Sequence, residues 1–300
     1  MTDKSPFNDK GVQFAWDATS ISAAQKCLRY YQYTLIEGWQ SRGQSEHLRF
    51  GAAYATALEH YFKYLAEGAA AEEALERVVL EALIETWDED GPWVSTHNLK
   101  NRENLIRTIV WYFEQFADDN MKVIHLANGK PAVELSFALE VDDGIIFSGH
   151  LDRVVDWDGD KYVMDQKTTG TTIGPFYFDQ FKPHTQFGMY TFAGKAIFNI
   201  PVRGVLIDAA QVAVGFSKFA RSPALFTASE LEEWYEGAHF WIAQAQAATL
   251  AGNFPMNPAS CGNYGGCAFR SVCARSPEVR PNFLAADFEK GTPWNPLRSR

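Results

Sequence analysis

Asp152, Asp165 and Lys167 bring two carboxylates and an amine into one short stretch of the chain. Two carboxylates held close together repel each other, and a divalent cation between them relieves that repulsion. Mg²⁺ and Mn²⁺ suit such a position because they prefer oxygen ligands and keep several waters. A water held in this way can attack a phosphodiester while the lysine stabilises the developing charge. The residues therefore predict metal-dependent phosphodiester hydrolysis, and the alternative is a surface hairpin with solvated acids and one salt bridge.

The hairpin that would position these groups is predicted by Asp158-Gly159. A two-residue type I′ loop needs positive φ at both positions, which Asp-Gly tolerates. Counting outward from this loop places Asp152 directly opposite Asp165. Because side chains alternate along a strand, Lys167 lies on the same face, opposite His150.

These segments resemble a known family of nucleases. Asp152 followed by Asp165-Gln166-Lys167 resembles the PD-(D/E)XK signature, and the wider runs Gly149–Arg153 and Asp165–Thr169 resemble its RecB-like branch. The resemblance implies that Asp152, Asp165 and the backbone carbonyl of Gln166 hold Mg²⁺ or Mn²⁺, with Lys167 assisting attack. It also implies a restriction-endonuclease-like fold, in which a mixed β-sheet is flanked by helices.

Downstream, Gln186 and Tyr190 match the Q-x-x-x-Y element of that branch. On a helix, two residues at this spacing share one face. In the family they sit beside the active site and contact substrate or metal-bound water, so the resemblance adds both to the catalytic set. Taken singly, such a pair is more often ordinary helix surface and core.

The chain departs from the family pattern at Ala55, where RecB-like nucleases carry a metal-binding histidine. Three alternatives follow. In the first, Glu59, one turn further on, reaches the metal, or a water takes the place of the histidine. In the second, His60 replaces the histidine as a metal ligand. In the third, the protein has lost activity and only binds DNA or a partner. Glu134 on the preceding strand is a further acid for the site, and its default interpretation is a solvent-facing charge.

The chain has only four cysteines, Cys27, Cys261, Cys267 and Cys273. The absence of a signal peptide or a membrane-spanning apolar run predicts a reducing setting, in which a disulfide framework is not expected. Four thiols in such a chain indicate a metal or cluster site. One distant cysteine joined to a C-terminal triplet resembles the [4Fe-4S] arrangement of RecB-like nucleases, including CRISPR-associated exonucleases. The wide interval between Cys261 and Cys267 leaves zinc and unligated thiols as alternatives.

Periodicity predicts the elements around these motifs. Helices are expected over residues 20–37, 45–67, 69–87 and 102–118, around Gln186 and Tyr190, and from a capping box at Thr227–Glu230 to about Gly252. Strands are expected over residues 133–141, 145–155, 162–168 and, as one or two strands, 202–214. The prediction is therefore an α/β fold with a helical N-terminal part. We expect one nuclease domain over residues 1–276, clasped at its two ends by the iron–sulfur site, and an extended tail over 277–300.

The net charge of −10 works against phosphate binding. Much of the excess is local, because residues 72–90 carry eight acidic side chains and one arginine. The candidates for phosphate contact are Arg29, Arg49, Arg153, Lys182, Lys218 and Arg221. We therefore expect weak, salt-sensitive binding to duplex DNA and a preference for ends or single strands.

The sequence favours a Mg²⁺- or Mn²⁺-dependent DNA exonuclease acting at DNA ends in recombination, repair or replication. The alternative is a catalytically inactive iron–sulfur subunit that keeps the nuclease fold for DNA binding or assembly. In its length and in its lack of a helicase signature, the chain resembles the phage-encoded or CRISPR-associated members of the family. The expected partners are DNA and a recombination or replication protein, with no membrane, and the expected location is the cytoplasm, or the host cytoplasm if the chain is phage-encoded.

Overall fold

The structure is a computed structural model that describes residues 5–43, 45–142, 144–263, 266–292 and 294–298. It divides into two compact units. The central unit comprises Gln44–Leu135 and His150–Thr227, and the terminal unit comprises Met1–Gly43, Ser136–Gly149 and Ala228–Arg300. Because the chain passes repeatedly between the two units, the expected single nuclease domain over residues 1–276 stays a prediction.

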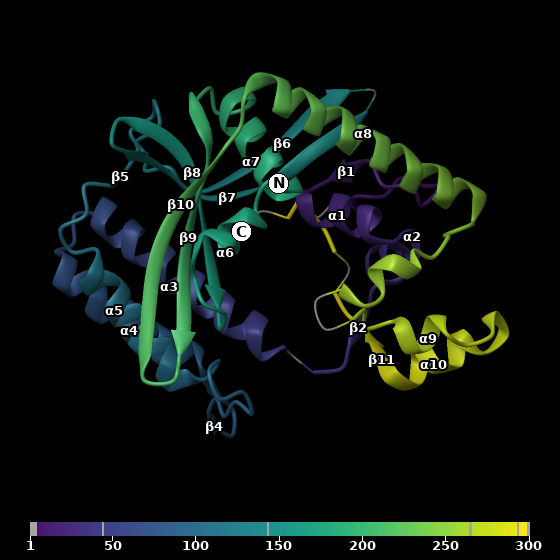
Figure 1. Ribbon diagram of the computed structural model, residues 1–300, viewed down its shortest axis with the longest axis horizontal. Coiled ribbons are helices and arrows are strands. Elements are labelled where there is room, and N and C mark those ends of the chain that lie inside the picture. The colour runs from purple at the N-terminus through teal and green to yellow at the C-terminus, as the bar shows by residue number, and fades with distance from the viewer. Residues whose placement is uncertain (1–4, 44, 143, 264–265, 293, 299–300) are drawn as a thin grey trace. The chain divides into compact units, whose positions relative to one another are not determined.

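The central unit contains a mixed β-sheet and its flanking helices (Figure 1). Its strands are β5 (Lys122–Val123), β7 (Ile145–Trp157, from His150 onward), β8 (Asp160–Thr169), β9 (Val202–Ala213) and β10 (Phe216–Leu225), with a small pair of β3 (Trp87–Asp88) and β4 (Gly91–Pro92). Its helices are α3 (Glu46–Ala66), α4 (Ala71–Glu85), α5 (Arg102–Gln115), α6 (Pro175–Asp179) and α7 (Thr185–Ala196). Strands β7 and β8 are antiparallel, β8 and β9 are parallel, and β9 and β10 are antiparallel. This arrangement confirms the predicted α/β fold with a mixed sheet.

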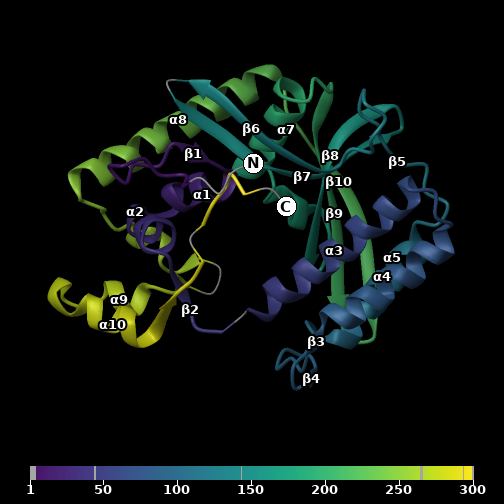
Figure 2. The same cartoon turned by 180° about the vertical axis from the view of Figure 1, so that it is seen from behind.

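Helices α3, α4 and α5 gather alongside β9 and β10 (Figures 1 and 2). In α3, Phe50, Tyr54, Ala57 and Leu58 are buried at the i, i+3 and i+4 spacing of one helix face. They form one core cluster with residues of α4 and α5 and with Ala210 and Val212 of β9. Burial of this face holds the three helices against one side of the sheet.

Helix α7 packs on the other side of the same strands. The register pairs Asp165 of β8 with Ile207 of β9, so these two side chains share a face, whereas Ala210 and Val212 have the opposite parity and face α3 to α5. On the α7 side, Gly194 lies so close to Val202 that an added Cβ would come within 2.7 Å of its side chain. The residues predicted to do chemistry therefore face α7.

The β7–β8 hairpin forms as the sequence predicts. Asp158 and Gly159 have φ values of 53° and 87°, as a type I′ loop requires. The pairs run from Trp157–Asp160 out to Arg153–Met164, which is the predicted register. The expected partners Asp152 and Asp165 come next in sequence after the last of these pairs.

The terminal unit holds both chain ends. It contains β1 (Ala15–Trp16), α1 (Ala18–Lys26), α2 (Leu28–Tyr31), a π-helical turn (Gln32–Ile36), β2 (Trp39–Ser41), most of β6 (Val133–Asp142), the start of β7, α8 (Ala228–Ala251), α9 (Arg270–Cys273), α10 (Arg280–Asp287), β11 (Phe288–Lys290) and 3₁₀ turns at Pro258–Ser260 and Pro277–Val279. Strand β1 runs parallel to the start of β7, which also pairs with β6, and α8 packs against α1 and α2. Among the described residues, no helix has the length and hydrophobicity needed to cross a lipid bilayer.

Two predictions for the terminal unit are wrong. The helix expected over residues 20–37 breaks at Cys27, which is extended (φ −175°, ψ 124°) and whose Sγ accepts the backbone N–H of Asn257 at 3.3 Å. The tail expected over 277–300 contains α10 and β11, and β11 pairs with β2. Leu284 and Phe288 explain the second outcome, because both are buried against the cluster formed with Tyr33.

Candidate active site

The predicted acid pair lies where β7 and β8 meet. Asp165 is only 2% exposed. Asp152 accepts the backbone N–H of Gln166 and lies close enough to Asp165 for the two carboxylates to interact. Burial, followed by the neighbouring Asp165 carboxylate, raises the pKa of Asp152 from 3.8 to about 6. The two acids therefore resist ionising together.

A chain of polar contacts joins this pair to α7. Lys167 Nζ lies 2.5 Å from Asp165 Oδ2 and donates to Gln186 Oε1 at 3.3 Å. Gln186 Nε2 in turn donates to the hydroxyl of Tyr190 at 2.8 Å. The Q-x-x-x-Y pair thus lies on one helix face, as predicted, and it fixes the position of the lysine amine beside the acids.

The carboxylates fit a divalent cation. Asp165 Oδ2 is buried and, despite the nearby lysine, receives no well-directed hydrogen bond from any described residue. Mg²⁺ is often held by one or two carboxylates and several waters, which matches this donor set. Among the described residues, no group of three or more histidine, cysteine, aspartate or glutamate side chains is arranged as a metal site.

Sequence reasoning missed two residues near the acids. His184, at the N-cap of α7, has its pKa lowered by burial and then by the Lys167 amine. Burial, followed by the Asp165 carboxylate, raises the pKa of Tyr177 to about 12. The only signal for His184 is its position two residues before Gln186. Nothing in the sequence around Tyr177 marks it.

The further acids proposed for the metal lie in different settings. Glu59 forms an i, i+4 ion pair with Lys63 on α3, and Ala55 lies one turn before it on the same helix. Glu134 lies in β6 with a φ of 50°, an uncommon backbone conformation for a residue other than glycine. His60 Nδ1 lies 2.7 Å from Glu81, which gives it a partner on the neighbouring helix α4. A metal-binding role for Glu59 or Glu134 stays a prediction.

The opposite face of the same strands carries a second cluster of charges. Asp208 of β9 is 2% exposed, and it lies 3.4 Å from Arg153 Nη2 and 3.2 Å from Arg221 Nε. The hydroxyl of Tyr112 donates to Asp208 Oδ2 at 2.5 Å, and Asp119 forms a further ion pair with Arg221. This cluster is fully inside the central unit.

The second cluster corrects two of the predicted phosphate contacts. Arg153 and Arg221 are buried, with side chains 2% and 6% exposed, so they bind Asp208 instead of DNA phosphates. Arg49 is also engaged, because its guanidinium binds both carboxylate oxygens of Asp88. The sequence could not distinguish these arginines from solvated ones, because their partners lie far away along the chain.

Gln166 connects the two faces. In the amide orientation that satisfies its neighbours, its oxygen accepts from Arg153 Nη2 at 2.6 Å and Nη1 at 2.9 Å, and its nitrogen donates to Asp152 Oδ2 at 3.3 Å. The ion cluster on one face therefore helps to orient an acid of the other.

The four cysteines converge in the terminal unit. Cys27, Cys261, Cys267 and Cys273 line one small cavity, and all four are free thiols. Burial, followed by the neighbouring Cys267 and Cys27, raises the pKa of Cys273. The four cysteines thus lie around one cavity, but they are not among any described group of three or more side chains arranged to hold a metal, so the shared metal or cluster stays a prediction.

Comparison with known proteins places the chain in a family. Residues 15–274 match the model of the PD-(D/E)XK nuclease superfamily, which covers most of the chain and includes the acid pair, the lysine and the Q-x-x-x-Y helix. The chain belongs to the PD-(D/E)XK nuclease superfamily, as its motifs predict.

Two individual proteins are similar to this chain. A solved structure from Eubacterium rectale, described as a "Putative exonuclease", superposes with a TM-score of 0.50 at 11% identity and covers 88% of this chain and 92% of that one. This likeness confirms the fold. The "Gene 69 protein" of Mycobacterium phage D29 is 31% identical over 85 residues, which are 28% of this chain and 31% of that protein. The match thus spans about a third of the relative's length.

Proposed function

We propose that this protein is a Mg²⁺- or Mn²⁺-dependent deoxyribonuclease that degrades DNA from its ends. The observation that carries the proposal is the pair formed by Asp152, which is partly buried, and Asp165, which is buried, with Lys167 Nζ 2.5 Å from Asp165. Superfamily membership supports a nuclease. The structural neighbour's name favours an exonuclease.

The chain's own residues divide the work. Asp152, Asp165 and the backbone carbonyl of Gln166 would hold the cation, which when bound would supply an activated water and polarise the scissile phosphate. Lys167 donates hydrogen bonds toward the attacked phosphate and stabilises the negative charge that develops there. Gln186 holds the Lys167 amine in place, and Tyr190 holds the amide of Gln186.

The test is a cleavage assay on end-labelled single strands, end-labelled duplexes and covalently closed circles, each with Mg²⁺, Mn²⁺ or EDTA. We expect metal-dependent loss of the linear substrates and survival of the circles. Asp165→Asn should abolish cleavage. Asp160→Asn is the matched control, because Asp160 lies in the same strand but is exposed and paired with Arg203. Intact linear DNA with a correctly folded protein contradicts the proposal, and cleavage of circles replaces exonuclease with endonuclease.

We infer in addition that the four cysteines hold a structural [4Fe-4S] cluster that joins the two ends of the terminal unit, with zinc as the alternative. Their common cavity supports this inference, as does the N–H···S contact from Asn257 to Cys27. Anaerobically purified protein should be brown and contain about four irons, as a [4Fe-4S] cluster held by four thiolates requires. Cys267→Ser should lower the iron content. Colourless protein with one zinc favours the alternative, and protein without either metal contradicts both.

A second candidate is an inactive DNA-binding or assembly subunit, which the alanine at position 55 favours. If the wild type does not cut DNA and Ala55→His does, the missing histidine explains the loss. If the wild type cuts and Asp165→Asn does not, this candidate is excluded. Roles in recombination, repair or replication, a protein partner and a cytoplasmic location stay predictions.

A further inference from the structure

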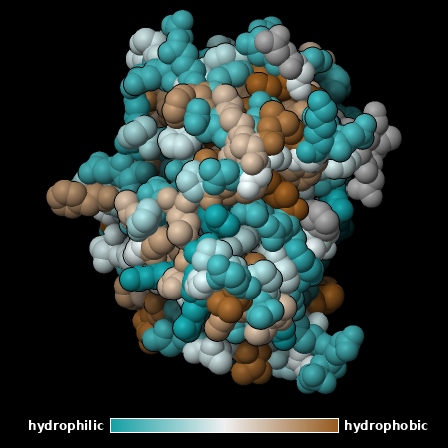
Figure 3. All heavy atoms as spheres, turned by 90° about the vertical axis from the view of Figure 1, so that its right-hand side faces the viewer, coloured by the Kyte–Doolittle hydropathy of each residue, from teal (hydrophilic) through white to brown (hydrophobic). Residues whose placement is uncertain are grey.

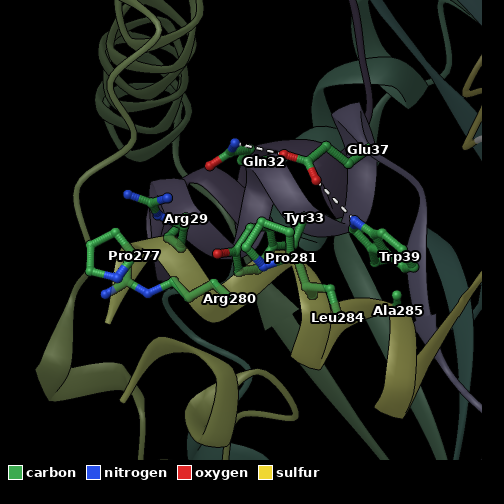
Figure 4. Close-up of a pocket in the computed structure, with 10 residues that line it drawn as sticks. All are labelled: Arg29, Gln32, Tyr33, Glu37, Trp39, Pro277, Arg280, Pro281, Leu284 and Ala285. Atoms are coloured by element: carbon green, nitrogen blue, oxygen red, sulfur yellow. Dashed lines mark hydrogen bonds between the residues drawn. The ribbon is translucent and has the colours of Figure 1, made fainter. Parts of the chain in front are cut away.

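A second pocket lies in the terminal unit, between the segment Arg29–Trp39 and helix α10 (Figure 4). Its volume is about 320 Å³, within the range of small-molecule sites. The two walls come from opposite ends of the chain, and the cleavage chemistry proposed above uses none of the lining residues. The pocket is therefore a separate feature that needs its own explanation.

Two arginines give the pocket its charge. Arg29 donates its Nε–H to the carbonyl of Phe254 at 3.0 Å, and Arg280 donates to the carbonyls of Arg275 and Cys273 at 3.0 and 3.1 Å. Within the described part of the chain, neither guanidinium forms an ion pair with a carboxylate. An arginine has five N–H donors, so both keep donors for a ligand. Backbone carbonyls thus hold two partly buried cations in place without neutralising them.

The other lining groups are suited to a nucleoside. Gln32 donates to Glu37 at 2.6 Å, but its Oε1 is buried and receives no hydrogen bond from the described residues; Figure 4 shows this oxygen turned away from Glu37. Trp39 offers an indole ring, one face of which carries the Lys290 amine at 3.8 Å. The pocket therefore combines donors for a phosphate, an unsatisfied acceptor and an aromatic surface.

On the face of the molecule shown in Figure 3, hydrophobic side chains form separate groups between hydrophilic ones. Guanidinium groups bind phosphates with paired, charge-assisted hydrogen bonds, and aromatic rings stack on bases. A ligand that carries both a phosphate and a base satisfies the lining groups better than an acidic peptide, which has no base.

We propose that this pocket binds one nucleotide, with its phosphate held by Arg29 and Arg280 and its base against Trp39. The nucleotide belongs either to a single DNA strand or to a free mononucleotide. The choice of a nucleotide over other phosphates rests on the proposed nuclease function. The inference that the pocket attracts a phosphate does not depend on the nuclease function.

The test measures binding and not cleavage, so it stays informative if the proposed activity fails. Full-length, anaerobically purified protein carrying Asp165→Asn is titrated with fluorescein-labelled oligo(dT) in EDTA at several salt concentrations. Arg280→Gln and Arg29→Gln should each weaken binding about tenfold, as expected for loss of a charge-assisted contact. Each should also reduce the slope of log affinity against log salt by about 0.7.

Two further variants separate this site from a folding defect or a general charge effect. Glu37→Gln removes the only carboxylate among the described lining residues and should tighten binding, which a misfolded protein cannot do. Arg77→Gln removes one positive charge from an exposed i, i+4 ion pair in the central unit and should change nothing. Unchanged affinity and slope in both pocket arginine variants, with no gain in Glu37→Gln, overturn the proposal.

Calorimetry with dTMP and with inorganic phosphate then identifies the source of the nucleotide. Binding of dTMP that is lost in Arg280→Gln indicates a free mononucleotide. Oligo(dT) binding that depends on Arg280 without measurable dTMP binding indicates a strand. Inorganic phosphate that binds as tightly as dTMP contradicts recognition of the base by Trp39.

Discussion

The two faces of the central sheet hold charges in opposite ways. On the α7 face, two aspartates share one lysine, and Asp165 Oδ2 is left without a well-directed hydrogen bond from the described residues. On the α5 face, Asp208 receives contacts from two arginines and a tyrosine. Asp152 and Arg153 are neighbours in β7, so their side chains lie on opposite faces of the sheet.

The difference separates function from stability. An acid pair that is largely withdrawn from water and has too few partners costs folding free energy and attracts a cation, as catalytic sites commonly do. A buried charge cluster in which each member has partners specifies one arrangement of the strands, and it becomes costly when a single member is removed. The Gln166 side chain links the two clusters by hydrogen bonds to Arg153 and Asp152. Mutations should therefore separate activity from stability.

The largest expected effect is on activity. Asp165→Asn should lower the cleavage rate by about 10³-fold or more, because it removes a metal ligand and the ion-pair partner of Lys167. The same change should leave the melting temperature equal to or above that of the wild type, because it relieves repulsion with Asp152. Calorimetry in EDTA together with the cleavage assay checks both parts, and a loss of stability would break the comparison.

The next largest effect is on stability. Asp208→Asn leaves Arg153 buried without a carboxylate and removes one of the two carboxylates that pair with Arg221, so it should cost about 3–5 kcal/mol of unfolding free energy. Asp160→Asn, in an exposed ion pair with Arg203, should cost less than about 1 kcal/mol. Urea unfolding measures both. Similar costs for the two variants would show that burial of the Asp208 cluster has no special effect.

The acid pair also predicts a pH dependence. The pKa of Asp152 is about 6 in the folded protein and 3.8 in the unfolded one, so folding takes up a proton between these values. Metal-free protein should therefore lose about 3 kcal/mol of stability as the pH rises from about 4 to above 6. Asp152→Asn should lack this loss. Comparing the two proteins at pH 5 and pH 7 in EDTA isolates the effect, and parallel profiles would exclude it.

The smallest effects compare two hydroxyl groups. Tyr112→Phe removes a hydrogen bond to Asp208 and should cost about 1 kcal/mol of stability without changing the cleavage rate. Tyr190→Phe removes the partner of Gln186 and should slow cleavage severalfold with little change in stability. Urea unfolding and single-turnover cleavage test the pair. If Tyr112→Phe slowed cleavage and Tyr190→Phe lowered stability, the roles assigned to the two faces of the sheet would be reversed.

Much of the site was predictable because its determinants are local. The Asp-Gly loop sets the register of β7 and β8, since only a few residues tolerate positive φ at both positions. That register and the alternation of side chains place Asp152, Asp165 and Lys167 on one face. The i, i+4 spacing likewise places Gln186 and Tyr190 together on α7. These preferences act over a few residues, so the sequence alone contains them.

Other contacts depend on residues that are distant in the chain. Nothing local distinguishes Arg153, which is buried beside Asp208, from a solvated arginine. The segment after Pro277 has the prolines of a tail, yet it folds because Leu284 and Phe288 find a partner in Tyr33.

By itself, the sequence determined the superfamily, the hairpin with its acid pair and the main helices and strands, because loop geometry and periodicity are properties of short segments. Only the tertiary structure decided which charges are buried together, that Cys27 meets the C-terminal cysteines, and that Arg29 and Arg280 line one pocket. These outcomes depend on packing between distant segments, which is governed by burial and shape and not by local conformational preference.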